Sequence, residues 1–161
     1  MLDQLAEFLL LILVANGAPV LLSYVFSHRV SLPVDFGLKL NDKQYLLGRT
    51  KTWRGIVSSL LATVLVAVFL GYGAVTGAVI SLLAMSGDLL SSFIKRRLRK
   101  KESSQAFLLD QVPESLFPSM GLLLMKYIDL TQVMVIVGCF IIIELTLSVV
   151  LYKIGVRKQP Y

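Results

Sequence analysis

The stretch from Ala74 to Lys100, AVTGAVISLLAMSGDLLSSFIKRRLRK, decides the fold of this chain. Its first part is apolar and long enough for a helix that crosses a bilayer, which needs about 20 residues. Asp88 interrupts the apolar part seven residues before Lys95. At a rise of about 1.5 Å per residue, this carboxylate lies roughly 10 Å inside the end of the helix. Because a carboxylate is costly in lipid, the stretch predicts a functional site where a hydrophobic helix meets a basic turn.

The composition of the whole chain agrees with a membrane environment. Of the 161 residues, 56% are hydrophobic and only 16% are charged, and the mean hydropathy is +0.77. Soluble domains carry about 25% charged residues. We therefore expect one integral-membrane domain over residues 1–161. The net charge of +6 fits the cytoplasmic loops of such a protein. Nucleic acid is excluded as a partner, since no soluble basic domain is present to bind it.

Five apolar segments predict an all-α, polytopic membrane protein with five transmembrane helices. Gly71-Tyr72-Gly73 predicts a tight turn between the second and third helices. The fourth segment is short and contains Pro118 and Gly121, so a kink is expected there. The predicted helices cover residues 4–27, 55–70, 74–94, 114–128 and 130–152, and the two polar loops cover residues 28–54 and 95–113.

The positive residues predict the orientation of the chain. Of the sixteen Lys and Arg residues, six lie in the first loop, six at 95–101, three after the last helix, and only Lys126 lies on the opposite side. Positive residues collect in cytoplasmic loops. We therefore expect the N-terminus outside, the C-terminus in the cytoplasm, and a cell-membrane protein whose polar chemistry faces the cytoplasm.

Polar residues inside the predicted helices allow both functional and structural interpretations. Asp88 is either a ligand for a divalent cation or the partner of a loop Arg, and Gly87 favours a ligand because it permits close approach. Asn16 precedes Pro19, which removes a backbone donor and frees carbonyls. Those carbonyls line a cavity, or the region is a plain kink with Asn16 bonded to another helix. Glu144 is predicted to be a helix-packing partner.

The segment Gly48-Arg49-Thr50-Lys51-Thr52-Trp53-Arg54-Gly55 places cations and hydroxyls at the start of the second helix. Free backbone N–H groups at a helix N-terminus attract phosphate, and Lys and Arg neutralise it. A basic patch for anionic lipid headgroups, anchored by Trp53, explains the same residues equally well.

Ordered motifs give this chain a family resemblance. Ser92-Phe93-Ile94-Lys95-Arg96, followed after four residues by Lys101-Glu102, resembles the S-x-x-K-R-x4-K-D core of the CDP-diacylglycerol synthase signature. Asp110-Gln111 falls where that signature ends in D-R, and Gly87-Asp88-Leu89 is similar to its upstream G-D-L. Lys51-Thr52-Trp53-Arg54-Gly55 resembles the K-T-x-E-G segment of the same enzymes. The chain looks most like the archaeal branch of the family, the CDP-archaeol synthases.

Three departures from the family pattern bear on the metal ligands. The His-Gly-Gly before D-R is missing, and Ser91 stands where bacterial members have Glu. Pro113-Glu114 takes the place of the second Asp in D-R-x-D. Glu114 either substitutes for that carboxylate or caps the fourth helix, whose first turn favours an acidic side chain.

The resemblance implies cytidylyl transfer from CTP to a membrane lipid phosphate, with Mg²⁺ as cofactor. The acceptor in the archaeal branch is an isoprenoid ether lipid phosphate, 2,3-bis-O-geranylgeranyl-sn-glycerol 1-phosphate, and the products are CDP-archaeol and pyrophosphate. The chemistry needs no strong base, because a lipid phosphate is already an anionic nucleophile. Two anions must instead be brought together and their charge stabilised. The implied catalytic residues are Asp88, Asp110, Lys95 and Arg96, of which Asp88 and Asp110 hold the metal, and the implied substrate-binding residues are Lys51, Thr52, Arg54, Ser92 and Asn16.

Two other classes of function remain open at this point. A small ion or solute transporter would use Asn16, Asp88 and Glu144 as its path. A non-catalytic membrane scaffold would use the basic loops to bind anionic lipids. The transporter leaves the ordered loop motifs unexplained, and Lys↔Arg exchanges at the motif positions would distinguish a scaffold from an enzyme.

Overall fold

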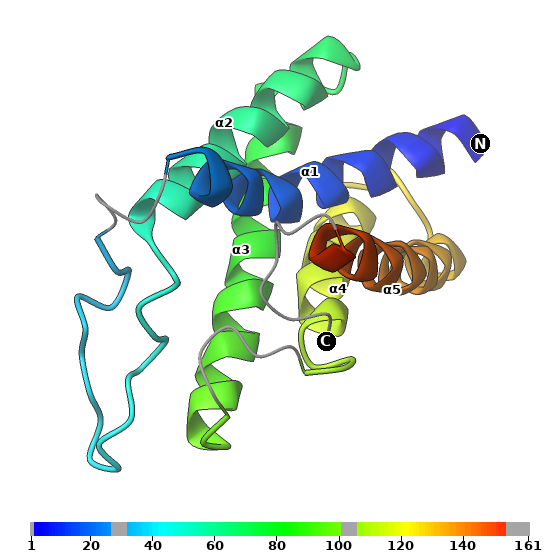
Figure 1. Cartoon of the computed structure of the whole chain (residues 1–161). Helices are drawn as coiled ribbons and strands as arrows, with labels where there is room; N and C mark the ends of the chain where they lie inside the picture. Colours follow the sequence, from blue (N-terminus) through cyan, green and yellow to red (C-terminus); the bar gives the residue numbers. More distant parts are fainter. Residues whose placement is uncertain (1, 27–31, 101–105, 154–161) are drawn as a thin grey trace.

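The structure, a computed structural model, describes residues 2–26, 32–100 and 106–153. Within these ranges the fold is all-helical, as predicted, and contains two isolated β-bridges but no strand. Five helices make up most of the described residues, and their arrangement is shown in Figure 1. The helices are α1 (Leu2–Phe26), α2 (Trp53–Phe69), α3 (Gly73–Arg97), α4 (Gln111–Leu124) and α5 (Leu130–Lys153).

Helix bounds differ from the predicted ones mainly around α3 and α4. The third helix continues through the basic residues to Arg97, because positive side chains are favourable at a helix C-terminus. The fourth helix was predicted at 114–128 but spans Gln111–Leu124. Pro113 fits its first turn, where no intrahelical N–H bond is lost. The chain then leaves the helix at Lys126, whose φ of 62° is left-handed.

In the part of the chain that the structure describes, three helices are long and apolar enough to cross a membrane, namely those over Leu2–Val25, Gly73–Arg97 and Leu130–Val150. The apolar helix α2 is shorter at 17 residues, and α4 has 14. The chain is therefore a membrane protein by length and composition of these helices.

A buried polar chain joins α1, α2 and α3 where Pro19 interrupts α1. Proline removes the N–H that would bond to the carbonyl of Ala15, four residues earlier. Ser59 of α2 donates to this carbonyl at 2.7 Å, and its hydroxyl lies 2.8 Å from that of Ser81 in α3. The freed carbonyl thus serves helix packing, which is the structural interpretation of Pro19.

The apolar core lies toward the N-terminal end of α3 and the two short connections. It is formed mainly by one face of α1 and the first half of α5, with single contributions from α2, α3 and α4. The fully or almost fully buried members are Phe8, Leu11, Ile12, Ala67, Ile80, Leu122, Ile128, Val133, Ile136 and Phe140. The opposite end of α3 is therefore supported by other interactions.

The long loop, residues 32–52, folds back on itself beside the C-terminal half of α3 (Figure 1). Its two bridges pair Pro33 with Thr52 and Lys39 with Tyr45. Arg97 attaches the loop to α3, because its guanidinium donates to the Asp42 carboxylate at 2.5 Å and to the Tyr45 carbonyl at 2.6 Å. The loop motif is thereby brought to the charged end of α3.

Candidate active site

Lys51 and Asp88 form the central contact of the site, although they lie 37 residues apart in the sequence. The ammonium of Lys51 donates to both carboxylate oxygens of Asp88, at 2.5 and 2.6 Å. Burial alone would lower the pKa of Lys51, but the Asp88 charge, helped by Glu114 and Asp110, raises it above its usual value. Lys51 is therefore a cation at neutral pH.

The backbone around Lys51 is fixed by its neighbours. Its carbonyl accepts from Val34 N–H at 2.9 Å across the loop. Asp35 organises the same loop, since its two oxygens accept from the N–H groups of Gly37, at 2.9 Å, and Leu47, at 2.8 Å. Thr52 then begins α2, because its hydroxyl accepts from Gly55 N–H at 3.2 Å. Lys51 thus reaches Asp88 from a rigid support.

Gly87 allows α4 to approach Asp88. A Cβ atom on Gly87 would lie 2.2 Å from the carbonyl oxygen of Pro113 and 2.8 Å from the Glu114 nitrogen. Only glycine permits such an approach of two backbones. Glu114 is consequently close enough to interact electrostatically with Asp88 and Lys51. The close approach predicted at Gly87 exists, but the partner is the first turn of α4.

A second ion pair joins α3 to the start of α4. The Lys95 ammonium lies 2.8 Å from Asp110 Oδ1, and both side chains are nearly buried, with exposed fractions of 10% and 12%. The other carboxylate oxygen of Asp110 accepts from Ala106 N–H at 2.9 Å. Two opposite charges withdrawn from water in this way are stable only as a pair.

The other predicted substrate-binding and catalytic residues in this region lie on α3 and at the start of α2. Arg96 and Ser92 are buried on α3, with exposed fractions of 6% and 3%. Arg54 is half-buried in the first turn of α2. The hydroxyl of Thr52, predicted to bind phosphate, caps α2 in this structure.

The Asn16 amide bonds within its own helix rather than to another helix as predicted, whereas Glu144 bonds to a neighbouring helix. The Asn16 amide donates to the carbonyl of Ile12, one turn back in α1, at 2.9 Å. Glu144 of α5 accepts from the Gln111 amide at 2.8 Å, so it is a packing partner of α4, as expected. Gln111 is fully buried and directly follows Asp110, and the Glu144 contact therefore secures the helix that begins at the site.

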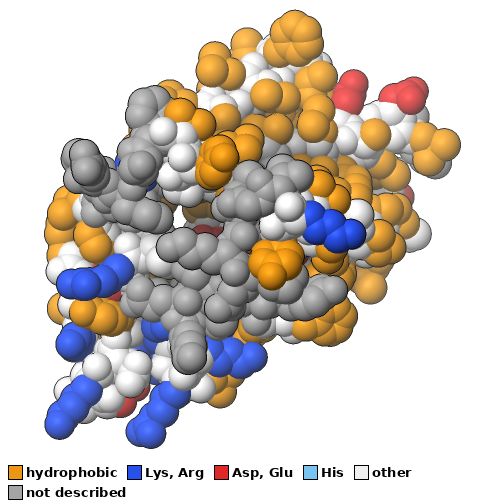
Figure 2. Space-filling view, in the orientation of Figure 1, with side chains coloured by type: hydrophobic (Ala, Val, Ile, Leu, Met, Phe, Trp, Pro, Cys, Tyr) orange, Lys and Arg blue, Asp and Glu red, His pale blue; other side chains and the backbone are white. Residues whose placement is uncertain are grey.

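Charged and hydrophobic side chains occupy different parts of the visible surface. Lys and Arg side chains gather at the end where α3 finishes and the loop lies, whereas hydrophobic side chains cover much of the remaining visible surface (Figure 2). Such a basic end suits an anionic substrate, since it raises the local concentration of anions.

The carboxylates of the site suit a magnesium ion only together with a substrate. Among the described residues, no group of three or more carboxylate, His or Cys side chains is placed to hold a metal by itself. Mg²⁺ is commonly held by one or two carboxylates plus substrate phosphates. Asp88 and Glu114, which interact with each other, fit that arrangement.

The sequence interpretation gave Glu114 only an open role. Gly87, one residue before Asp88, is the signal that would have strengthened a role for Glu114. A glycine at this position allows the backbone of a second segment to pass close to Asp88. Neither residue alone reveals that α4 is the neighbour, because the contact joins segments 27 residues apart.

A solved structure defines the class of protein to which this fold corresponds. It is described as an intramembrane enzyme for archaeal membrane lipids biosynthesis, and it matches this chain with a TM-score of 0.71 and 29% identity. The match covers 88% of this chain and 90% of the other. The fold is that of an intramembrane enzyme.

The family is shown by sequence. The CarS-like family model, described as CDP-archaeol synthase, matches residues 1–161, and the chain belongs to this family. It is 34% identical over 157 residues to the CDP-archaeol synthase of Sulfolobus acidocaldarius, covering 92% of this chain and 91% of that one. The match to the Thermofilum pendens CDP-archaeol synthase is 43% over 104 residues, but it covers only 51% of that relative. The family resemblance predicted from the motifs is confirmed, and with it the class of nucleotidyltransferases.

Proposed function

We propose that this chain transfers CMP from CTP to a lipid phosphate, 2,3-bis-O-geranylgeranyl-sn-glycerol 1-phosphate, giving CDP-archaeol and pyrophosphate. The observation that carries the proposal is the Lys51–Asp88 contact, because it joins the loop motif to the carboxylate of α3. These are the two segments that carry the family resemblance. Membership of the CarS-like family supports the same reaction.

The reaction requires two anions to meet at one phosphorus atom. A phosphate oxygen of the lipid attacks the α-phosphorus of CTP, the bond to the β-phosphate oxygen breaks, and pyrophosphate leaves with that electron pair. Lys51, Lys95 and Arg96 offer positive charge at the end of α3 where this charge develops. Fixed cations in a partly buried site stabilise such charge more strongly than water does.

A magnesium ion would neutralise charge on the transferring and leaving phosphates. We assign Asp88 to this ion, with Glu114 and Asp110 as further carboxylates near it. The assignment is supported by the hard oxygen donors of Asp and Glu and by their interactions with the same ammonium, that of Lys51.

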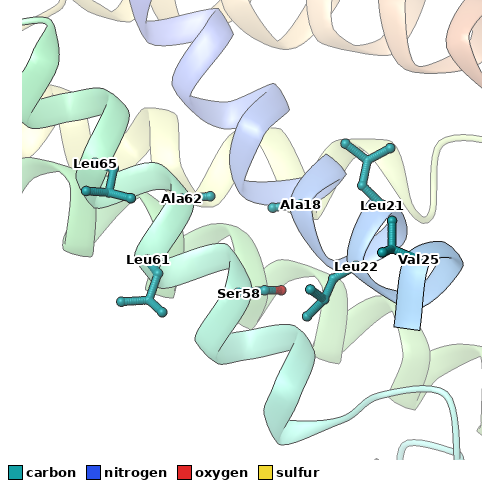
Figure 3. A pocket seen from close by; sticks show the side chains of 8 residues that line it. All are labelled: Ala18, Leu21, Leu22, Val25, Ser58, Leu61, Ala62 and Leu65. Atoms are coloured by element: carbon teal, nitrogen blue, oxygen red, sulfur yellow. The ribbon is translucent and has the colours of Figure 1, made fainter. Parts of the chain in front are cut away.

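An apolar groove between α1 and α2 supports a substrate with hydrocarbon chains. It has a volume of about 430 Å³, and its lining is aliphatic except for Ser58 (Figure 3). A second groove of about 330 Å³ shares Ala18, Leu21 and Ala62 with the first. Ser58 lies one turn beyond Gly55, so one lining residue of the groove is close in sequence to the loop motif. We assign the isoprenoid chains to this groove and the lipid phosphate to the loop motif beside it.

We also propose that all five helices cross the membrane, with the N-terminus outside and the site facing the cytoplasm. The short helices α2 and α4 are supported by the longer ones packed against them. Single cysteines at Lys43 and Lys126, in a Cys139→Ala background, test the orientation. An impermeant reagent added to intact cells should label position 126 and not position 43, and the reverse pattern would overturn this topology.

The decisive experiment on function is pyrophosphate release by the purified protein in detergent. Release should require Mg²⁺, CTP and the geranylgeranyl glycerol phosphate together, and replacing CTP by ATP should abolish it. No release from folded protein, with acyl phosphatidic acid also tried, would overturn the proposal. The transporter and scaffold alternatives are not favoured, since both leave the family membership unexplained.

A further inference from the structure

The contact between Lys51 and Asp88 places an ammonium on the carboxylate that is assigned to the metal. Both oxygens of Asp88 are engaged, at 2.5 and 2.6 Å. We propose that Lys51 acts as an exchangeable counter-ion: it neutralises Asp88 before substrates bind, and it moves onto the nucleotide phosphates when the divalent cation takes Asp88. This inference rests on the proposed function and adds the order in which the site is filled.

Burial explains why the exchange has to be coupled. The exposed fractions of the Lys51 and Asp88 side chains are 24% and 19%. An uncompensated charge in such a partly buried place is unfavourable. Asp88 therefore needs a cation at every stage, and Lys51 needs an anion. The cation alone would displace Lys51 without giving it a new partner, whereas CTP supplies that partner, so metal and nucleotide should promote each other's binding.

The chemistry of lysine suits this role. Its ammonium is a compact charge on a flexible chain of four carbons, whereas the planar guanidinium of arginine would hold the Asp88 carboxylate through two fixed hydrogen bonds. The backbone of Lys51 is meanwhile held by Val34, and α2 begins at the next residue with the Thr52 cap. Lys51 can thus change partner by side-chain rotation alone.

The released ammonium remains beside the first turn of α2, because Thr52, the next residue, is the N-cap of that helix. Two N–H groups of this turn are already used, since Trp53 N–H donates to the Leu32 carbonyl at 3.1 Å and Gly55 N–H donates to the Thr52 hydroxyl at 3.2 Å. Arg54 lies in the same turn and adds positive charge. The nucleotide phosphates would then lie between the helix terminus and Asp88, within reach of Lys51 from its present position.

The test measures Mn²⁺ binding without nucleotide, by electron paramagnetic resonance, on the full chain in detergent. Three forms are compared: wild type, Lys51→Met and Lys51→Arg. The exchange predicts that Lys51→Met binds Mn²⁺ more tightly than wild type, by about tenfold, within the usual range of coupling between sites. It also predicts that Lys51→Arg binds more weakly, because arginine competes better for Asp88.

The arginine variant separates exchange from a general effect of charge. If charge alone mattered, Lys51→Arg would match wild type, and the exchange would be overturned. Equal or weaker Mn²⁺ binding by Lys51→Met would overturn it too. Lys43→Met removes the same charge from an exposed position of the loop and should leave Mn²⁺ affinity unchanged.

Wild-type protein provides a measurement that needs no variant. With Mn²⁺ binding to free CTP subtracted, CTP should raise the Mn²⁺ affinity of the wild-type site, and an unchanged affinity would overturn the exchange. Pyrophosphate release distinguishes the two proposals. Release by wild type without the predicted order of Mn²⁺ affinities refutes the exchange alone, and no release refutes the transferase, whatever the Mn²⁺ affinities are.

Discussion

The two ends of α3 are stabilised by different kinds of interaction. At the C-terminal end, Asp88 and Lys95 of this helix form ion pairs with Lys51 and Asp110 from two other segments. Close charges in a partly buried place contribute little net stability, because desolvation offsets their attraction. Such ion pairs are expected where a charged substrate has to be bound, because the site then needs charged side chains of its own.

At the N-terminal end, three aromatic rings take the place of ion pairs. Phe8 lies 4.7 Å from Tyr72 and 5.5 Å from Tyr127, measured between ring centroids. The Tyr72 hydroxyl donates to Glu7 at 2.5 Å, and that of Tyr127 lies 3.3 Å from the Thr76 hydroxyl. This end buries apolar area and satisfies its polar groups. The comparison teaches that stability is concentrated at one end of α3 and chemistry at the other, and mutations can separate the two.

The largest effect is expected from Asp88→Asn. This change keeps the shape of the side chain but removes the charge that pairs with Lys51 and is assigned to the metal. Pyrophosphate release should fall by at least about 100-fold, as when a group that stabilises transition-state charge is lost. Asp129→Asn is the matched control, since Asp129 caps α5 near the aromatic end through Gln132 N–H. Full turnover by Asp88→Asn would remove the main support for the site.

Gly87→Ala should affect both stability and activity. The added Cβ would meet the Pro113 carbonyl oxygen at 2.2 Å, so the backbone of α4 has to move. Overpacking of this kind costs about 1–3 kcal/mol, and the movement also separates Glu114 from Asp88. Gly138→Ala in α5 is the control, because nothing lies within 4 Å of its added Cβ. In the control, the thermal midpoint of unfolding and the rate of pyrophosphate release should be equal to or higher than those of wild type.

Tyr72→Phe should lower stability while leaving the chemistry intact. The variant loses the hydrogen bond to Glu7, worth about 1 kcal/mol, but keeps the ring contact with Phe8. The thermal midpoint should fall, and the kcat for pyrophosphate release at a temperature where both proteins are folded should match wild type. A large loss of kcat would contradict the separation of the two ends.

The same hydroxyl predicts a dependence of stability on pH. Burial, and then the hydrogen bond to Glu7, raise the pKa of Tyr72 from 10.0 to about 12. The folded protein thus favours the neutral hydroxyl, so its stabilisation is complete below pH 10 and is lost as the pH rises through about 12. Wild type should lose more stability over this interval than Tyr72→Phe. Parallel curves for the two proteins would show that the hydroxyl contributes nothing.

The general fold could be predicted because lipid imposes simple rules. Apolar runs of sufficient length predicted helices, and the turn at Gly71-Tyr72-Gly73 separates α2 from α3 as expected. The exact start of α4 could not be predicted, since Gln111 and Pro113 read equally well as loop residues. Their helical state depends on packing against Gly87 and on the Gln111–Glu144 contact, which are long-range.

The motifs could single out residues of the candidate site, but they could not predict the contacts between those residues. The motifs singled out Lys51 and Asp88 separately, because each is an unusual charge beside an apolar helix. Their direct contact depends on how the loop folds back, and that depends on Asp35, which binds the N–H groups of Gly37 and Leu47. An acidic residue in a polar loop gives no signal of this role.

The smallest effect is expected from Asp42→Asn, which tests how firmly the loop is attached to the charged end. Asp42 is exposed, and Arg97 keeps its hydrogen bond to the Tyr45 carbonyl and its position over the Phe93 ring when the carboxylate is lost. Exposed ion pairs contribute little and are screened by salt. The KM for CTP should therefore rise by roughly threefold or less at low salt, and the difference should vanish near 1 M salt, where the Debye length is about 3 Å. Asp129→Asn should show no salt-dependent change. A large rise in KM that persists at high salt would mean that Asp42 contacts the nucleotide itself, and the charged end would then extend along the loop beyond Lys51.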